Sequence, residues 1–563
     1  MLANLLRVLV AFVLWALPTL VRAQDRPDKP GDPLAKAEAL LAAAEALPGL
    51  SVLVARDGKV LFQQSIGFAD FDKRIRATPA TKFRIGSVTK QFTAAAILKL
   101  IEDGELQLED TLDRFLPDFP RGDEVTIHHL LSHTSGIPSY TDAPEFMRTV
   151  TEPTTEEDLI ASFAGQDFLF EPGSEFRYNN SGYFLLGHLV RKITGQPLAE
   201  YWQEHFFTPL GMNDTSVHDP AAGLTNEAKG YSFQDGKATL ALDWNMTRAG
   251  GAGAIVSTVQ DLFRWNEAVF GGKVIGEDSL TRALTVSEQS QDSMRYGYGW
   301  TINEDRGLRE VSHNGGLQGF LSHLAWYPDQ RLTIAVLHNA SPPVPAMTPG
   351  AVAKRLAEIF LADDMAPTPD RQVDTTVDPA IYDRYVGRYD YGSAVMTVSR
   401  QGDKLMTRIT GQPTFELFPE SETKFFLKVV DAQVEFVVDE QGVCVAVKHT
   451  QGPVRFRAAK LADAAQTAEQ LDAFLGIYDY RSAKMRVTRD DTQLFAQLDG
   501  QPRMPIYPMA EGVPADKRDG ASGDTFQWKV VEAKIEFIRD EDGKVIAAKH
   551  TQAGATFRVE KVE

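Results

Sequence analysis

The pattern of apolar and polar positions places strands at both ends of residues 30–365 and helices between them. Two apolar runs, at residues 50–55 and 59–65, are joined by Asp57-Gly58, which is a strong signal for a β-hairpin. Further strand-like runs come late in this segment, at residues 308–312, 321–327 and 332–337. Strands that flank a helical region predict one α/β (α+β) domain with its own core.

The helices of this segment are marked by stretches rich in Ala and Leu. One helix is predicted over residues 30–48 and another over 83–105, where small residues recur and Gly104 gives an end signal. Residues 106–300 mix helical runs with loops rich in Gly, Pro and Asn. A last helix is predicted over residues 350–362.

The organisation changes after this domain. Residues 366–379 are polar and contain prolines, which is typical of a linker. The chain then repeats itself: KVVDAQVEF at 428–436 returns as KVVEAKIEF at 529–537. Short alternating runs broken by Gly and Asp turns predict two small all-β barrels, lipocalin-like, over 377–461 and 469–563. The alternative is a single sandwich built from both halves.

Length and charge narrow the classes of function. At 563 residues the chain is too long for one core, which suggests about two to four domains. The formal net charge is -19, from 77 acidic against 58 basic side chains. Because nucleic-acid binding needs a concentrated basic surface, this balance argues against a nucleic-acid partner. It argues more weakly against docking on anionic lipid.

The first 23 residues have the order of a secretory signal peptide. Arg7 precedes an apolar run at residues 8–17, and the segment ends in the small residue Ala23. Cleavage after Ala23 predicts an exported protein, periplasmic or secreted. The apolar run is shorter than the ~20 residues that a membrane span needs, so an uncleaved N-terminal anchor is the less favoured alternative.

Metal and other cofactors find no support in the sequence. The only cysteine, Cys444, lies far from the N-terminus, so there is no lipid-anchor motif, no intramolecular disulfide and no thiolate metal cluster. The chain contains no His-Glu-x-x-His motif, no Walker loop and no cluster of His ligands. We therefore expect no metal and no cofactor.

The first candidate for chemistry is Ser87-Val88-Thr89-Lys90, at the start of the Ala-rich helix. Residues three apart on a helix share a face, so the hydroxyl and the amine can meet. Serine needs a base to become a nucleophile, and a lysine can serve if burial lowers its pKa. The alternative is an ordinary helix start, with Ser87 as the cap and Lys90 on the solvated face. A second Ser-x-x-Lys, at 421–424, falls in a polar turn and is interpreted as having no catalytic role.

The second candidate is Tyr178-Asn179-Asn180. A Tyr hydroxyl that faces an ammonium can be held partly ionised and can carry protons. Asn180, two residues on in an extended segment, can point to the same side and offer an amide to a substrate. Taken alone, the motif is better explained as an Asn-rich loop with a buried Tyr.

The third candidate is His313-Asn314-Gly315-Gly316, at the end of the strand-like run 308–312. Glycines at this place let a substrate backbone come close to the strand edge. The N–H groups of Gly316 and Ser87 could together form an oxyanion hole. The alternative is a glycine turn with a His on the surface.

Together these motifs make the chain resemble the serine β-lactamase and penicillin-binding-protein superfamily. They occur in the order Ser-x-x-Lys, Tyr-x-Asn, His-x-Gly, about 90 and 135 residues apart. The resemblance covers residues 30–365 and points to the branch of class C β-lactamases, D-Ala-D-Ala carboxypeptidases and D-aminopeptidases. Supporting stretches are LSHTSG at 131–136, PLGM at 209–212 and YGW at 298–300.

The resemblance implies a β-lactamase/transpeptidase-like domain, in which a five-stranded antiparallel sheet lies beside a helical region with the site between them. It implies that Ser87 attacks a carbonyl and that Lys90 and Tyr178 move the proton. Water then releases the acyl-enzyme. The implied substrate-binding residues are Asn180, His313 and Gly315.

One position departs from the pattern of this group. His313 stands where most of its β-lactamases carry a Lys, and a neutral His anchors a carboxylate less strongly. The departure points away from efficient β-lactam hydrolysis. A catalytic domain followed by two barrels is similar to bacterial D-aminopeptidases, in which a loop of the last barrel reaches the active site. An insertion around residues 510–521 of the second repeat is the candidate for that loop.

The leading function is hydrolysis of amide bonds in small D-amino-acid peptides or amides. A broad-specificity carboxylesterase is the second, and a D,D-carboxypeptidase or weak β-lactamase the third. A cell-envelope binding protein is the non-enzymatic alternative, and the intact Ser87, Lys90, Tyr178 and His313 argue against it. The expected partner is a small-molecule or short-peptide substrate, with no nucleic acid and no metal. The oligomeric state, a homodimer included, stays open.

Overall fold

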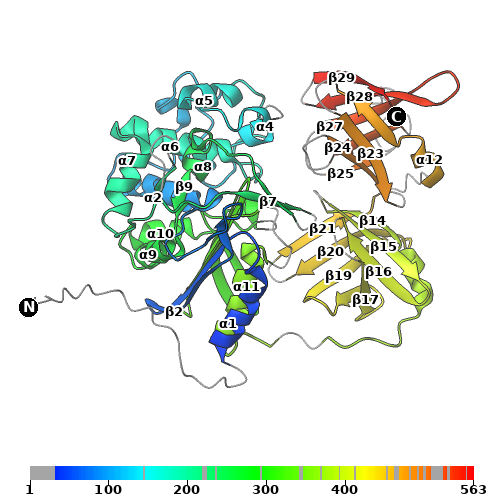
Figure 1. Cartoon of the computed structure of the whole chain (residues 1–563), viewed down its shortest axis with the longest axis horizontal. Coiled ribbons are helices and arrows are strands. Elements are labelled where there is room, and N and C mark those ends of the chain that lie inside the picture. The colour runs from blue at the N-terminus through cyan, green and yellow to red at the C-terminus, as the bar shows by residue number, and fades with distance from the viewer. Residues whose placement is uncertain are drawn as a thin grey trace, which may run out of the picture.

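The computed structural model contains a mixed α/β region followed by two all-β regions (Figure 1). It describes residues 32–562, apart from 144–145, 219–224, 235–236, 292–293, 342–346, 368–370, 392–393, 411–413, 452–453, 462–467, 481–483, 491–492, 499–502, 509–523, 529–532 and 553–554. The predicted signal peptide at 1–23 and the insertion at 510–521 lie outside the described residues.

An antiparallel sheet forms the centre of the first region, with strand order β10-β11-β12-β13-β1-β2. Its strands are β1 (Leu50–Arg56), β2 (Lys59–Ile66), β10 (Thr301–Asp305), β11 (Leu308–Leu317), β12 (Phe320–Tyr327) and β13 (Leu332–His338). The sheet has six strands and not the five that the resemblance implied. The sequence TINED of β10 has no apolar run, so nothing in its pattern predicts a strand, and its pairing with β11 creates one.

The predicted hairpin at the N-terminal end of this sheet is confirmed. β1 and β2 pair antiparallel and are joined by Asp57 and Gly58, whose φ angles are 53° and 73°. Positive φ at both central residues matches the twist of the flanking strands, and Gly and Asp accept it at low cost.

Helices cover both faces of the sheet. On one face, α11 (Pro349–Phe360) packs on β12 and β13, and α1 (Pro33–Leu41) lies against α11. On the other, α9 (Val259–Phe270) packs on β1 and β13. The helix predicted over 30–48 ends early, because the chain turns through a 3-10 segment at Ala42–Ala44.

The segment predicted as a helix over 83–105 has three parts. It begins as strand β5 (Phe83–Arg84), continues as a 3-10 turn, η2 (Gly86–Val88), and only then becomes α2 (Thr89–Glu102). β5 pairs with β9 (Ile255–Ser257), which also pairs with β6 (Ser216–Val217). This pairing takes the first residues out of the helix.

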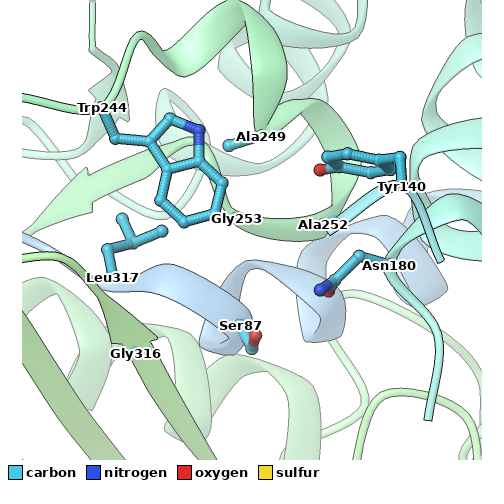
Figure 2. A pocket seen from close by; sticks show the side chains of 9 residues that line it. All are labelled: Ser87, Tyr140, Asn180, Trp244, Ala249, Ala252, Gly253, Gly316 and Leu317. Atoms are coloured by element: carbon cyan, nitrogen blue, oxygen red, sulfur yellow. The ribbon is translucent and has the colours of Figure 1, made fainter. Parts of the chain in front are cut away.

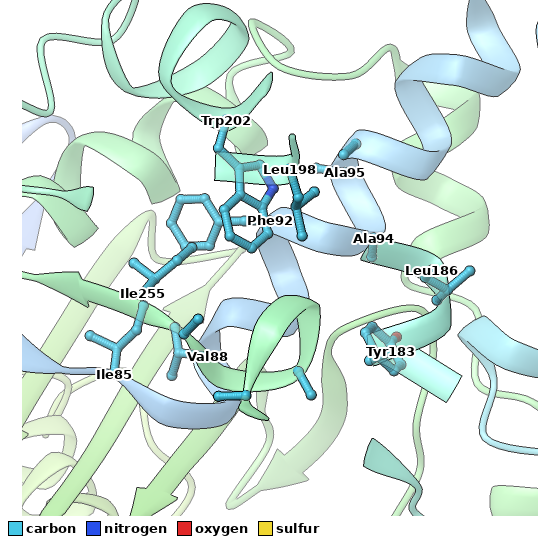
Figure 3. Packing of buried hydrophobic residues seen from close by; sticks show 14 of the residues in the cluster. Ile85, Val88, Phe92, Ala94, Ala95, Tyr183, Leu186, Leu198, Trp202 and Ile255 are labelled. Atoms are coloured by element: carbon cyan, nitrogen blue, oxygen red, sulfur yellow. The ribbon is translucent and has the colours of Figure 1, made fainter. Parts of the chain in front are cut away.

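Helix α2 is surrounded by other elements, which explains why it is apolar on nearly every side. Figure 3 shows Phe92, Ala94 and Ala95 of α2 among Tyr183, Leu186, Leu198 and Trp202. The helices of this region include α3 (Ile127–Leu131), α4 (Phe146–Thr149), α5 (Glu156–Ala164), α6 (Asn180–Thr194), α7 (Leu198–Trp202), α8 (Gly250–Gly253) and α10 (Glu277–Ala283). Two strands, β7 (Tyr231–Gln234) and β8 (Lys237–Leu240), form a separate hairpin.

Each of the two repeats forms its own eight-stranded barrel, so the alternative of a single sandwich is wrong. The second barrel is closed, and in the first a bridge between Tyr389 and Lys460 joins the two ends of the sheet. The first contains β14 (Gly387–Asp390), β15 (Val395–Gln401), β16 (Lys404–Ile409), β17 (Phe415–Pro419), β18 (Lys424–Leu427), β19 (Ala432–Val438), β20 (Cys444–Gln451) and β21 (Val454–Ala459). The second follows α12 (Ala468–Asp472) and contains β22 (Gly476–Asp479), β23 (Lys484–Asp490), β24 (Gln493–Leu498), β25 (Met504–Pro508), β26 (Thr525–Trp528), β27 (Ala533–Arg539), β28 (Val545–Gln552) and β29 (Ala555–Lys561).

Tyr389 and Tyr478, which occupy equivalent positions in the two repeats, belong to the barrel cores. Tyr389 and Tyr478 are fully buried, and their hydroxyls donate to the carbonyls of Tyr385 and Phe474 at 2.7 and 2.8 Å. Within the described part of the chain, no helix is long and apolar enough to cross a membrane.

Candidate active site

Ser87 lies on a tight turn between strand β5 and helix α2. The N–H of Ile85 donates to the carbonyl of Ile255 at 3.0 Å, which fixes the end of β5. Gly86 then takes a φ of 51°, a left-handed angle that suits glycine. The sharp reversal presents the Ser87 side chain at the start of the buried helix, facing the pocket in Figure 2.

Lys90 is completely buried one turn along from Ser87. Its Nζ lies 3.1 Å from Ser87 Oγ, 2.7 Å from Asn180 Oδ1 and 2.9 Å from the carbonyl oxygen of Ala252. The alternative that places Lys90 on a solvated helix face is therefore wrong. All three partners are uncharged, and burial lowers the pKa of the Lys90 amine well below its usual value. A neutral amine in this place can take the proton of the Ser87 hydroxyl.

Tyr178 packs against the same amine. The Lys90 Nζ lies 4.8 Å from the centre of the Tyr178 ring. Among the described residues the Tyr178 hydroxyl is buried without a hydrogen-bond partner. Burial raises the pKa of this phenol, and the nearby Ser87 hydroxyl only partly opposes the effect. The phenol is therefore protonated, which differs from the partly ionised Tyr that the sequence suggested.

Asn180 does not lie in an extended segment, because helix α6 begins with it. Asn179 is the N-cap, and its side-chain oxygen accepts the N–H of Gly182 at 2.9 Å. The Asn180 carboxamide contacts Lys90 through Oδ1 and donates from Nδ2 to Thr141 Oγ1 at 3.0 Å. The structure therefore brings Asn180 to Ser87 and Lys90 by the start of a helix.

His313 lies in the middle of β11 and not after the end of a strand, since β11 continues to Leu317. It is buried, so the alternative of a surface His is wrong. His313 Nδ1 forms a hydrogen bond with the carbonyl oxygen of Asn314 at 2.6 Å. His313 Nε2 forms a hydrogen bond with the Tyr296 hydroxyl at 2.9 Å. Burial lowers the pKa of His313 to about 3, so the ring is neutral. His313 is not among the residues that line the pocket, and both of its ring nitrogens form hydrogen bonds within the protein.

Gly315 and Gly316 have different surroundings. A Cβ atom on Gly315 would overlap the Ile85 carbonyl oxygen and the Ser322 hydroxyl. The absence of a side chain at Gly315 therefore lets the segment that leads to Ser87 pack against β11. From the sequence, we expected this glycine to make room for the backbone of a substrate. Gly316 does line the pocket together with Ser87, as an oxyanion role requires.

The pocket at Ser87 is small, and no charged side chain lines it (Figure 2). Asn180 and Ser87 lie at its floor, and Tyr140, Trp244 and Leu317 supply apolar walls. The lining residues are Ser87, Tyr140, Asn180, Trp244, Ala249, Ala252, Gly253, Gly316 and Leu317. An apolar pocket with a few convergent polar groups is typical of a small-molecule site.

Sequence reasoning missed the walls of this pocket. Trp244 is held by Arg84, whose guanidinium donates to the Trp244 carbonyl at 2.9 Å and forms an ion pair with Glu227 at 3.2 Å. The Tyr140 hydroxyl donates to the Arg248 carbonyl at 2.6 Å. Both aromatics lie in loop or 3-10 segments without a periodic pattern, so no signal in the sequence marks them.

The described residues offer no metal site: no group of three or more His, Cys, Asp or Glu side chains is placed to hold an ion.

This fold and site define a serine hydrolase of the β-lactamase/transpeptidase type. Residues 34–358 match the family model described as Beta-lactamase, and the chain belongs to that family. Residues 371–461, which include the first barrel, match a model described as a domain of unknown function, DUF3471.

Relatives and solved structures agree with this assignment. The chain is 31% identical over 423 residues to Penicillin-binding protein 4* of Bacillus subtilis. The aligned region covers 71% of this chain and 93% of the relative. It is 26% identical to the octameric penicillin-binding protein homologue from Pyrococcus abyssi, with a TM-score of 0.54 over 75% of this chain and 99% of that one. A D-stereospecific amidohydrolase from Streptomyces sp. is 25% identical, with a TM-score of 0.51 over 58% of this chain and 98% of that one.

Proposed function

We propose that this protein hydrolyses amide bonds in small D-amino-acid peptides or amides, through an acyl-enzyme on Ser87. The observation that carries the proposal is the buried Lys90 amine, 3.1 Å from the Ser87 hydroxyl and without a charged partner in its contacts. The likeness to a D-stereospecific amidohydrolase supports an amide substrate of D configuration.

The first step forms the acyl-enzyme. The lone pair of Lys90 Nζ takes the proton of Ser87 Oγ, and Oγ forms a bond to the substrate carbonyl carbon. The carbonyl electron pair moves to oxygen, where the N–H groups of Ser87 and Gly316 stabilise the negative charge. Lys90 becomes a buried ammonium without a charged partner, so it gives up its new proton readily.

The second step expels the amine. The protonated Tyr178 phenol donates to the leaving nitrogen and regains a proton from the Lys90 ammonium, while the carbon–nitrogen bond breaks. Water then attacks the ester, with Lys90 taking the water proton and returning it to Ser87 Oγ as the acid leaves. Lys90, Tyr178 and Ser87 end in the protonation states in which they began.

A broad-specificity carboxylesterase is the second candidate, and the pocket favours it. None of the nine residues that line the pocket carries a charge, so an uncharged acyl group fits without an unpaired ion. The same observation weighs against a D,D-carboxypeptidase, because the neutral, internally bonded His313 offers no cation to a substrate carboxylate.

The test compares the nitroanilides of D-alanine and L-alanine with nitrophenyl acetate, using Ser87→Ala as the control. Release that favours the D-anilide and disappears in the variant supports the amidase. Release from the ester alone, again abolished in Ser87→Ala, moves the assignment to the esterase. Release that persists in Ser87→Ala contradicts both.

We also propose that residues 1–23 direct export and that the insertion at 510–521 sets the size of the substrates accepted. The first proposal predicts a mature protein in the periplasm or medium whose N-terminal residue is Gln24. The second predicts that deleting the insertion changes the preference between short and longer peptides. An intact Met1 in the exported protein, or an unchanged preference, contradicts the respective proposal.

A further inference from the structure

His133 holds the main chain on both sides of Tyr178. The N–H of Arg177 donates to the His133 carbonyl at 3.0 Å, and the N–H of Asn179 donates to His133 Nδ1 at 3.1 Å. Tyr178 lies between these two bonds. One residue, which belongs to a different segment of the chain, therefore fixes the backbone immediately before and after the phenol.

The imidazole of His133 is suited to accept the Asn179 N–H. Its Nδ1 is the acceptor, so the ring proton lies on Nε2, which is buried without a partner among the described residues. Burial, with Lys90 as the next contribution, lowers the pKa of His133 well below its ordinary value. The ring stays neutral, and the acceptor is not lost by protonation.

The same ring packs against the Tyr178 ring, with an angle of 40° between the two ring planes. The ring centres of His133 and Tyr178 are 4.4 Å apart, and those of Tyr183 and Tyr296 lie 4.9 and 4.6 Å from His133. Tyr296 in turn bonds His313. The phenol is therefore restrained at its backbone by hydrogen bonds and at its ring by an aromatic cluster.

This arrangement has a local cost. His133 has a φ of 60°, in the left-handed region that residues other than Gly occupy uncommonly, although Asn, Asp and His are enriched there. A strained residue that serves only packing could be replaced by Gly or Asn. Here the left-handed angle lets the carbonyl and the side chain of one residue reach the N–H groups of Arg177 and Asn179, on either side of Tyr178.

We propose that His133 is a positioning residue that holds the Tyr178 hydroxyl in line for proton transfer between Lys90 and the leaving group. The proposal rests on the function proposed for Tyr178 above. Because Lys90 Nζ lies against the Tyr178 ring at 4.8 Å and not in a hydrogen bond with its hydroxyl, small shifts of the phenol change the transfer distance directly.

The test uses two substitutions that separate the acceptor from the ring. His133→Asn keeps an acceptor at the position of Nδ1 and tolerates positive φ, whereas His133→Phe keeps the ring and loses the acceptor. Rates are measured per active site, counted by titration with a covalent inhibitor of Ser87, so that loss of folded protein does not enter. We expect His133→Phe to lower kcat on the order of 10- to 100-fold with KM nearly unchanged, and His133→Asn to restore most of the loss.

Three outcomes overturn the proposal. Equal kcat per active site in His133→Phe and the parent protein excludes a positioning role, as does a His133→Asn variant no better than His133→Phe. If Tyr178→Phe has no effect on kcat, the role proposed for Tyr178 fails first and the role of His133 falls with it. Should His133→Phe not fold, His133→Gly replaces it, since glycine tolerates the same φ and has no acceptor.

Discussion

Gly86 and Gly316 are packed backbone against backbone: a Cβ atom on Gly86 would lie 2.8 Å from the amide nitrogen of Gly316. This contact joins the turn that carries Ser87 to strand β11, which comes more than 200 residues later in the chain. It brings the two N–H groups proposed for the oxyanion hole, those of Ser87 and Gly316, to one side of the pocket. The alignment of nucleophile and oxyanion donors thus depends on two residues without side chains.

Gly86→Ala is expected to destabilise the protein much more than Gly104→Ala. Both glycines have positive φ, of 51° and 78°, so both variants pay about 1 kcal/mol for the backbone angle. At Gly86 the new Cβ also collides with the backbone of Gly316, and moving that backbone costs roughly 1–3 kcal/mol more. At Gly104 there is no such cost, because nothing lies within 4 Å of a Cβ atom there. Chemical denaturation of both variants measures the difference, and equal losses would refute the close contact.

Lys90→Met is expected to abolish most activity while leaving the fold intact. The substitution removes the base, so kcat/KM falls on the order of 10³-fold or more. The substitution removes the free-energy cost of burying an amine, but it leaves the Ala252 carbonyl without its hydrogen bond. Because these two effects oppose each other, the free energy of unfolding should change by no more than about 1 kcal/mol. The matched control is Lys99→Met on the exposed side of the same helix, paired with Asp103, which retains activity. A Lys90→Met variant that remains active contradicts the assignment of the base.

Activity is expected to rise with pH as Lys90 loses its proton. Its pKa is lowered in the folded protein, and only the neutral amine can take the Ser87 proton. Between this lowered pKa and the unfolded value near 10.4, the unfolded chain binds the extra proton, so stability also rises with pH through this window. Lys90→Met should flatten that part of the stability profile.

The acid limb of the activity profile is expected to reflect the ionisation of Lys90 and not that of Tyr178 or His313. Burial raises the pKa of Tyr178 and lowers that of His313 to about 3, so neither group titrates near neutral pH. Tyr178→Phe is therefore expected to lower kcat and leave the midpoint of the limb in place. Loss or displacement of the midpoint in Tyr178→Phe would assign the ionisation to the phenol instead.

Trp244→Ala is expected to change which acyl groups the enzyme accepts. The indole forms a wall of the pocket, and its removal makes room for a longer chain. The ratio of kcat/KM for nitrophenyl butyrate to that for the acetate should rise roughly 10-fold, the scale of a few methylene groups in an apolar pocket. Leu242→Ala, two residues earlier and exposed, serves as the control. An unchanged ratio in Trp244→Ala would show that acyl groups bind elsewhere.

Local sequence signals predicted the elements whose structure depends on nearby residues. Asp57-Gly58 specifies its hairpin because both residues accept positive φ, and the internal repeat specifies two barrels of the same strand order. The Ser-x-x-Lys spacing also places Ser87 and Lys90 together, since residues three apart share a helix face.

Contacts between distant segments could not be read in the same way. The residues Asn-Gly-Gly after His313 favour a turn, yet they continue β11 because Ile85 packs against Gly315 and β12 pairs alongside. His133 looks like one more residue of the stretch LSHTSG until the fold brings Tyr178 against it. Trp244 becomes a pocket wall only through the buried Arg84.

Trapping the acyl-enzyme tests the role of Ser87 as the nucleophile. The protein is incubated with an activated ester, quenched in acid and digested, and the peptides are weighed by mass spectrometry. The mechanism through Ser87 predicts one acyl group per chain on the peptide that contains Ser87, and no adduct in Ser87→Ala. An adduct on another residue, or turnover that persists in Ser87→Ala, would contradict it.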